Sequence, residues 1–196
     1  MLKRSLAALV IGFAAMAPTS APTLAAETFK IDESHAFVYY KVSHSGWSNA
    51  MGRFNKVSGS FTVDEADPSK SKVEVVIQAN SIDSGFGPRD KHLMSADFFN
   101  AKEFPEIKFV STKIEKTGDR TGKMTGDLTM LGVTKPVSFD FTWNKKSPHF
   151  RKKNEIHTGF SAQLTLNRSD WGMKKFIPAI GDTVTLFLEI EGLYTK

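Results

Sequence analysis

The sequence contains no cysteine among its 196 residues. This absence excludes disulfide bonds, thiolate metal sites and a lipid anchor on an N-terminal cysteine. Beyond the first 25 residues the sequence also lacks any apolar run long enough to span a bilayer. The chain must therefore hold its fold by burying a core, and about 170 residues are enough for that.

The first 25 residues have the pattern of a secretory signal peptide. Lys3 and Arg4 supply a basic start, residues 6–17 form an apolar stretch too short to span a bilayer comfortably, and small residues follow. The sequence therefore predicts a signal peptide over residues 1–25 and an exported mature domain over residues 26–196.

Net charge carries little information about function in this chain. The formal charge is +5, and it falls by two, to +3, when the leader with Lys3 and Arg4 is removed. The basic residues are scattered except for one cluster, which we interpret as a solvated loop rather than a nucleic-acid site. The cluster consists of Lys145, Lys146, Arg151, Lys152 and Lys153.

Apolar and polar residues alternate with a period of two through most of the mature domain, which is typical of half-buried strands. Short connections rich in turn residues separate the alternating segments, and they favour antiparallel neighbours. The pattern predicts an all-β fold of eight antiparallel strands, either a sandwich or a closed barrel, whose interior holds side chains or one small ligand. The eight segments are 37–42, 59–63, 72–79, 107–112, 125–130, 137–143, 160–166 and 184–191.

One segment, residues 81–99, interrupts this pattern. Pro88 suits the first position of a helix, and Asp90 then lies in the first turn, where a carboxylate suits the helix dipole. The sequence predicts a helix of about two turns that ends before the aromatic pair Phe98 and Phe99. We interpret this helix as a lid or plug over a barrel mouth, or else as a simple cap on the core.

The inward side of the strands is unusually aromatic. A core built only to fill space would use more Leu, Ile and Val, whereas wide planar side chains suit a cavity for an apolar ligand. A plain aromatic core is the alternative, and composition does not separate the two. The inward aromatic residues are Tyr40, Phe61, Phe109, Phe139, Phe141, Trp143 and Phe160.

Short motifs follow one another in order along the whole mature domain. They are DESH (32–35), VYYKVSH (38–44), GRF (52–54), GSFTVD (59–64), ANSI (79–82), RDKHLMSADFF (89–99), FPEIKFVST (104–112), TGDLT (125–129), GVTKPV (132–137), GFS (159–161), NRSDWG (167–172) and GDTV (181–184). Together they resemble the YceI-like family of polyisoprenoid-binding periplasmic proteins. The resemblance implies an eight-stranded antiparallel lipocalin-like barrel with a short inserted helix. It also implies a periplasmic homodimer that holds a long-chain isoprenoid or similar amphiphilic lipid without a cofactor.

The resemblance places the ligand among the inward barrel residues and the helix with its aromatic pair. Tyr40 and Trp171 depart from the Phe that is usual in the family, and each adds a polar edge for binding a head group or for reshaping the cavity. Arg89, His92 and Trp171 are the candidates for orienting the head group. The predicted binding residues are Val38, Tyr40, Val42, Phe61, Ile77, Arg89, His92, Leu93, Phe98, Phe99, Phe109, Leu128, Met130, Phe139, Phe141, Phe160 and Trp171.

Two arginines have structural as well as ligand-binding interpretations. We expect Arg89 to pair with Asp90 or Asp97 at the end of the helix, although its planar fork would also suit a phosphate at the barrel mouth. Arg168 is expected to lock a turn.

Other site chemistries have little support in the sequence. The five histidines form neither HxH nor HExxH, so we predict no metal site and expect His35 and His44 to hydrogen-bond turns and strand ends. There is no GxSxG for a hydrolase. A nucleic-acid site would need exposed aromatics between basic residues, whereas the aromatics here point inward.

The sequence therefore predicts non-catalytic binding and carriage of a lipid inside the barrel, without stable insertion into a membrane. Two alternatives stay open at this point. One is an enzyme that acts on a lipid or quinone in the same cavity, and the other is an exported stress factor that binds a protein partner through its outer face.

Overall fold

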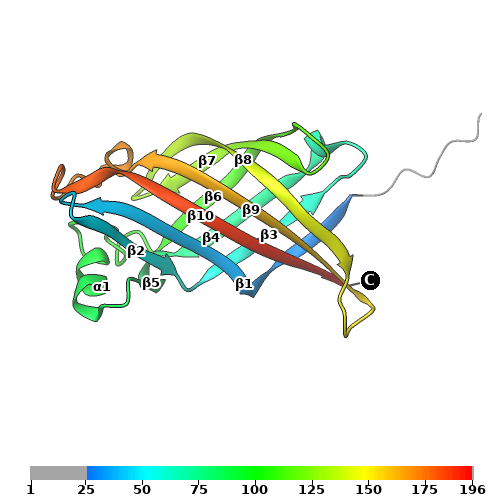
Figure 1. Ribbon diagram of the computed structural model, residues 1–196, viewed down its shortest axis with the longest axis horizontal. Helices are drawn as coiled ribbons and strands as arrows, with labels where there is room; N and C mark the ends of the chain where they lie inside the picture. Colours follow the sequence, from blue (N-terminus) through cyan, green and yellow to red (C-terminus); the bar gives the residue numbers. More distant parts are fainter. Residues whose placement is uncertain (1–25, 196) are drawn as a thin grey trace, which may run out of the picture.

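The alternating segments form one sheet that closes on itself (Figure 1). The computed structural model describes residues 26–195, so the predicted signal peptide lies outside the described residues. The elements are β1 (Glu27–His44), β2 (Ser48–Phe54), β3 (Val57–Val63), η1 (Pro68–Lys70), β4 (Lys72–Gln78), η2 (Ala79–Ser81), β5 (Ile82–Asp83), α1 (Gly87–Leu93), β6 (Glu106–Lys116), β7 (Thr121–Met130), β8 (Val133–Pro148), β9 (Glu155–Asn167), η3 (Arg168–Trp171) and β10 (Ile180–Thr195).

The sheet closes because β1 and β10, the first and last strands along the chain, pair with each other. The strand order is β10-β9-β8-β7-β6-β4-β3-β1-β2-β5, and β10 also pairs with β1. β2 and β3 follow one another along β1 as a single broken strand, with Val38 opposite Phe54 and Glu27 opposite Val63. The predicted fold is therefore confirmed: an eight-stranded antiparallel barrel with one short α-helix between strands, within residues 26–195. None of the helices there is long and apolar enough to cross a membrane.

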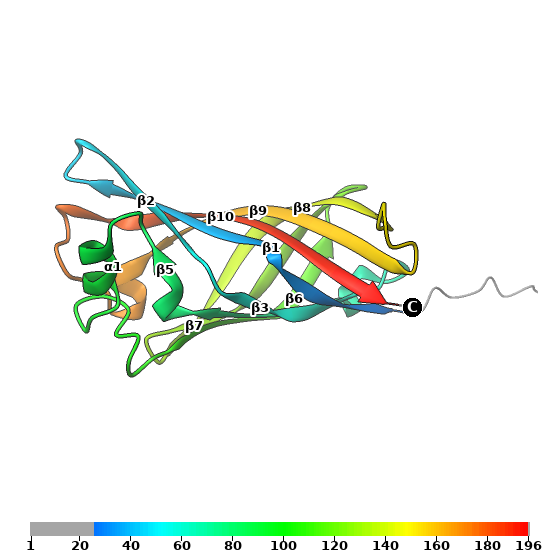
Figure 2. The same ribbon diagram turned by 90° about the horizontal axis from the view of Figure 1, so that it is seen from below.

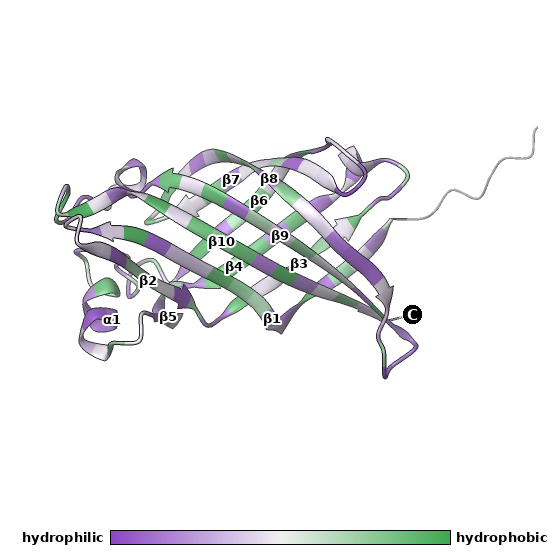
Figure 3. Cartoon of the chain, viewed as in Figure 1, coloured by the Kyte–Doolittle hydropathy of each residue, from purple (hydrophilic) through white to green (hydrophobic). Residues whose placement is uncertain are grey.

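The period-two pattern correctly assigned the inward face. In β8, Val137 and Phe139 are half-buried, whereas the intervening Ser138 and Asp140 are exposed. Figure 3 shows the same alternation of apolar and polar residues along β9 and β10. Each strand therefore presents its apolar residues to the interior of the barrel and its polar residues to solvent.

Two glycines on β7 make room for aromatic rings inside the barrel. The ring of Phe141 lies over Gly122 and the ring of Phe109 lies over Gly126, so that a side chain at either glycine would overlap a ring. Glycine inside a strand commonly marks such a close approach. The rings consequently lie along the wall of the barrel instead of filling its centre.

Two segments, 79–105 and 168–180, cover one end of the barrel, which we call the closed end. Figures 1 and 2 place α1 at this end. Phe98 and Trp171 are buried there, and the indole Nε1 of Trp171 donates to the carbonyl oxygen of Leu128 at 3.0 Å. The helix and its flanking residues thus plug this end of the barrel.

Arg168 holds the second of these segments in place. Its side chain is 4% exposed, and its guanidinium donates to the carbonyl oxygens of Met173, Lys175, Ile180 and Gly181 at 2.8 to 3.0 Å. Burial lowers the pKa of the guanidinium, but an arginine remains charged at any ordinary pH. The predicted structural role of Arg168 in locking a turn is confirmed.

Replacement of Arg168 by methionine should destabilise the protein. Four carbonyl oxygens, one at a buried hydrogen bond and three at part-buried ones, would lose the guanidinium as donor, and leaving such groups unpaired costs on the order of 3 kcal/mol in the free energy of unfolding. Urea unfolding followed by circular dichroism measures this change. Arg53→Met is the control, because Arg53 is exposed, and its effect should stay within about 0.5 kcal/mol. Equal losses in the two variants would contradict the structural role.

Candidate ligand-binding cavity

The barrel encloses a cavity of about 330 Å³. Strands β1, β3, β4 and β6 to β10 all contribute apolar side chains to its wall. Eight of the 17 residues predicted to bind the ligand line this cavity. They are Val38, Phe61, Ile77, Phe109, Leu128, Phe139, Phe141 and Phe160.

Phe160 contacts two other aromatic residues of the wall edge to face. The ring centroids of Phe61 and Phe160 lie 5.5 Å apart, and those of Phe141 and Phe160 lie 6.0 Å apart. Phe109, Phe141 and Phe160 are nevertheless only half-buried, although they point inward. Because part of each ring remains accessible, these residues line an apolar cavity and do not form a filled core.

The cavity opens at the end of the barrel opposite α1, which we call the open end. Its lining reaches Asp64 and Glu65 in the β3–β4 connection and Lys116, Asp119 and Arg120 around the β6–β7 turn. All of these except the half-buried Asp64 are exposed. No residue of α1 lines the cavity. The helix is thus a plug at the closed end, and the mouth of the cavity is polar.

Nine of the predicted binding residues do not line the cavity. Their part in binding stays a prediction, and it would require the closed end to rearrange. They are Tyr40, Val42, Arg89, His92, Leu93, Phe98, Phe99, Met130 and Trp171.

The three residues expected to orient a head group already have partners. Arg89 donates to the hydroxyl and carbonyl oxygens of Ser84 at 2.7 and 2.8 Å, so the expected pairing with Asp90 or Asp97 is replaced by bonds to Ser84. His92 Nε2 lies 3.0 Å from the Asp97 carboxylate. Trp171 uses its indole N–H at Leu128, as described above.

Tyr40 also lies toward the closed end, where its ring packs against Phe54 at a centroid distance of 6.4 Å. Burial raises the pKa of the Tyr40 phenol to about 12, so the side chain is neutral at physiological pH.

Several residues of the wall were absent from the predicted binding set. Trp143 lines the cavity near its mouth, and its indole N–H donates to the Thr158 hydroxyl at 2.8 Å. The same period-two pattern that identified Phe139 and Phe141 includes Trp143, and it also includes Val75 of β4. The residues of the mouth lie in turns, where no periodic pattern marks a face.

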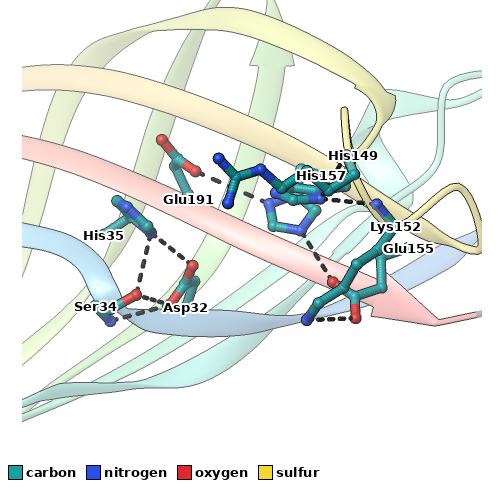
Figure 4. A network of polar contacts seen from close by, with 9 residues as sticks. Asp32, Ser34, His35, His149, Lys152, Glu155, His157 and Glu191 are labelled. Atoms are coloured by element: carbon teal, nitrogen blue, oxygen red, sulfur yellow. Dashed lines mark hydrogen bonds and ion pairs between the residues drawn. The ribbon is translucent and has the colours of Figure 1, made fainter.

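A cluster of polar side chains, Asp32, Ser34 and His35, lies on the outer face of the barrel, where β1 bulges opposite Glu191 (Figure 4). His35 Nδ1 lies 2.7 Å from the Asp32 carboxylate, and Ser34 donates its hydroxyl to the same carboxylate at 2.6 Å. Partial burial raises the pKa of Asp32, but hydrogen bonds from Ser34 and His35 outweigh it and lower the pKa to about 2. The expectation that His35 hydrogen-bonds a turn or a strand end is wrong, because its partners Asp32 and Ser34 lie at a bulge within β1.

Two residues of this cluster, together with the neighbouring Glu191, could act as metal ligands, and they form the one such set found within residues 26–195. One atom each from Asp32, His35 and Glu191 lie within 4.8 Å of one another. His35 and Glu191 are exposed, and the Asp32 carboxylate is already taken up by His35 and Ser34. The absence of a metal site therefore stays a prediction.

The Asp32–His35 pair makes a pH-dependent contribution to stability. The hydrogen bond to Asp32 raises the pKa of His35 above its ordinary value of about 6.5, so the contribution is full below that value and is lost as pH rises through the folded-state pKa. An NMR titration of the His35 ring should show the raised pKa, and Asp32→Asn should bring it back toward about 6.5. Glu33→Gln, an exposed neighbour, is the control and should leave the pKa unchanged. An identical pKa in wild type and Asp32→Asn would refute the assignment.

Comparison with known proteins places this barrel among similar chains. The YceI-like domain model matches residues 29–192. A UPF0312 protein of Pseudomonas putida (strain GB-1) is 44% identical over 200 residues, with 100% of both chains covered. The YCEI protein of Campylobacter jejuni is 30% identical and has a TM-score of 0.70, over 79% of this chain and 90% of that chain.

A polyisoprenoid binding domain from Saccharophagus degradans, implicated in plant cell wall breakdown, aligns with a TM-score of 0.66 over 86% of this chain and 98% of that chain. Its sequence identity of 15% shows a likeness of fold alone. From the family match and the 44% identity to a full-length relative, the chain belongs to the YceI-like domain family.

Proposed function

We propose that the protein binds and carries a long-chain isoprenoid or similar amphiphilic lipid in the periplasm, without catalysing a reaction. The observation that carries this proposal is the apolar cavity, whose aromatic walls are only half-buried inside a closed barrel. Its volume of about 330 Å³ falls in the range of small-molecule sites. The structural similarity to the polyisoprenoid binding domain of Saccharophagus degradans supports the same class of ligand.

The driving force is burial of the lipid tail. Each CH₂ group moved from water into an apolar cavity contributes about 0.8 kcal/mol, so a tail of several isoprene units outweighs the cost of ordering it. An apolar wall of this kind accepts a chain in many registers but does not orient it. The polar residues at the mouth are the groups best placed to contact a head group, because the other end of the cavity is plugged.

The wall offers little for catalysis. No histidine within residues 26–195 lines the cavity, and its acidic and basic residues lie at the mouth. A hydrolase or an acid–base enzyme needs a nucleophile or base beside the reacting group. This distribution supports a binding role over an enzyme acting on a lipid or quinone. The homodimer and the periplasmic location implied by the resemblance belong to the same proposal.

Protein purified from its native source should contain an apolar ligand. Extraction with organic solvent followed by mass spectrometry should identify a long-chain amphiphile in a constant ratio to protein, because a cavity of this kind is costly to leave hydrated. Consistently ligand-free protein from native cells would argue strongly against the proposal.

A charge placed in the wall should abolish binding. Phe141→Asp puts a carboxyl group into the apolar cavity, where it is unfavourable whether it ionises or takes up a proton, and we expect lipid retention to fall at least about tenfold. Phe37→Asp is the matched control, because Phe37 alternates with the inward Val38 and does not line the cavity, and circular dichroism must show that both variants fold. Full retention of lipid by folded Phe141→Asp would eliminate the internal site.

A further inference from the structure

The basic cluster of the sequence lies on the connection between β8 and β9. We call residues 145–154 the basic hairpin. Phe150 is 73% exposed, and Lys145, Arg151 and Lys153 form no ion pair with any residue between 26 and 195. Lys152 pairs with Glu155 at 3.0 Å. The hairpin therefore presents an exposed aromatic ring together with three cations, Lys145, Arg151 and Lys153, that have no acidic partner within residues 26–195.

The tip of the hairpin has a defined shape. The His149 ring nitrogen Nδ1 accepts hydrogen bonds from the backbone N–H groups of Arg151 and Lys152 at 3.2 and 3.1 Å. The ring centroids of His149 and His157 lie 4.7 Å apart. The backbone N–H of His149 donates to the Glu155 carbonyl oxygen at 2.8 Å. Arg151 sits 5.0 Å from the Phe150 ring. Phe150 and its neighbouring cation are thus held at one protruding point.

The basic hairpin is at the open end of the barrel. Figure 1 shows the connection between β8 and β9 extending beyond the end opposite α1. The strand that leads into it contacts the mouth, since Arg120 donates to the Asn144 carbonyl oxygen at 3.0 Å. Lys146 bonds Glu65 of the mouth at 2.6 Å and also pairs with Glu27. The hairpin and the mouth of the cavity therefore belong to the same end of the molecule.

We propose that the basic hairpin docks the open end of the barrel on an anionic phospholipid surface. Aromatic side chains favour the boundary between head groups and acyl chains, and lysine and arginine are attracted by the negative surface of a bilayer. The basic hairpin contains five lysine and arginine residues, and one acidic residue, Glu155, follows it directly. Its positive charge is therefore complementary to such a surface. A protruding tip suits a bilayer, whereas a folded protein partner would call for a groove or a flat face.

This docking goes beyond the proposed function, because the hairpin binds the surface whether or not the cavity holds a lipid. It has a consequence for that function. With the hairpin on the membrane, the mouth is on the membrane side, and a tail can pass between bilayer and cavity with little exposure to water.

Vesicle sedimentation tests the proposal with the purified mature protein. It should bind vesicles containing phosphatidylglycerol and not vesicles of phosphatidylcholine alone, and high salt should weaken the binding. Lys145→Gln, Arg151→Gln and Lys153→Gln combined should lower partitioning about a hundredfold, since each cation near such a surface contributes about fivefold. Phe150→Ser should lower it about tenfold through lost apolar burial.

Matched controls come from the closed end. Lys91→Gln, Lys102→Gln and Lys174→Gln remove the same charge from exposed positions, and Trp47→Ser removes an aromatic ring that is 83% exposed. These variants should keep binding within about twofold once the general loss of charge is allowed for. Near-UV and far-UV circular dichroism establish that every variant is folded.

Several results would overturn the proposal. The wild-type protein fails to bind anionic vesicles, or the closed-end and hairpin variants lose vesicle binding equally, or the hairpin variants keep wild-type binding. Salt-sensitive capture of duplex DNA in place of vesicles would assign the hairpin to another anion. Because the vesicles test docking alone, protein that still purifies with its lipid would leave the proposed function standing after such a failure.

Discussion

Pairing between β1 and β10 is the interaction on which the rest of the structure depends. It runs from Lys30 opposite Leu193 to His44 opposite Ile180 and joins the first and last strands within residues 26–195. Closure pairs β10 with β1, leaves an unpaired sheet edge at β2 and β5, and turns one face of each barrel strand toward a common interior. Without this pairing, the aromatic residues of β8 and β9 would belong to an open sheet that could pack against another layer.

The interior is a cavity because of how its rings are placed. Gly122 and Gly126 let the rings of Phe141 and Phe109 lie against the wall, and Gly192 does the same for Phe61. An eight-stranded barrel is just wide enough for side chains to fill it or for one small ligand to enter. Rings held along the wall leave the centre of the barrel free, and Phe109 and Phe141 stay partly accessible there.

The two ends of the barrel serve different purposes. At the closed end, long connections supply a buried arginine, a buried tryptophan and the short helix, and their polar groups bond within the chain. At the open end, tight turns leave charged side chains in solvent around the mouth. The cavity therefore has a blind apolar interior and a polar exit, and the basic hairpin gives that exit a distinctive surface charge.

The sequence by itself determined which residues face inward, since period two is a local property, and it located a short helix from Pro88 and Asp90. It also carried enough ordered motifs to identify the family. It did not determine which strands pair at closure, because alternation assigns a face but no neighbour, and β1 and β10 are far apart in the chain. For the same reason, only the tertiary structure decided that α1, Arg89 and Trp171 lie opposite the mouth, and that Glu191 meets His35. Those placements depend on pairings between distant strands, whose free energy comes from packing that no local pattern contains.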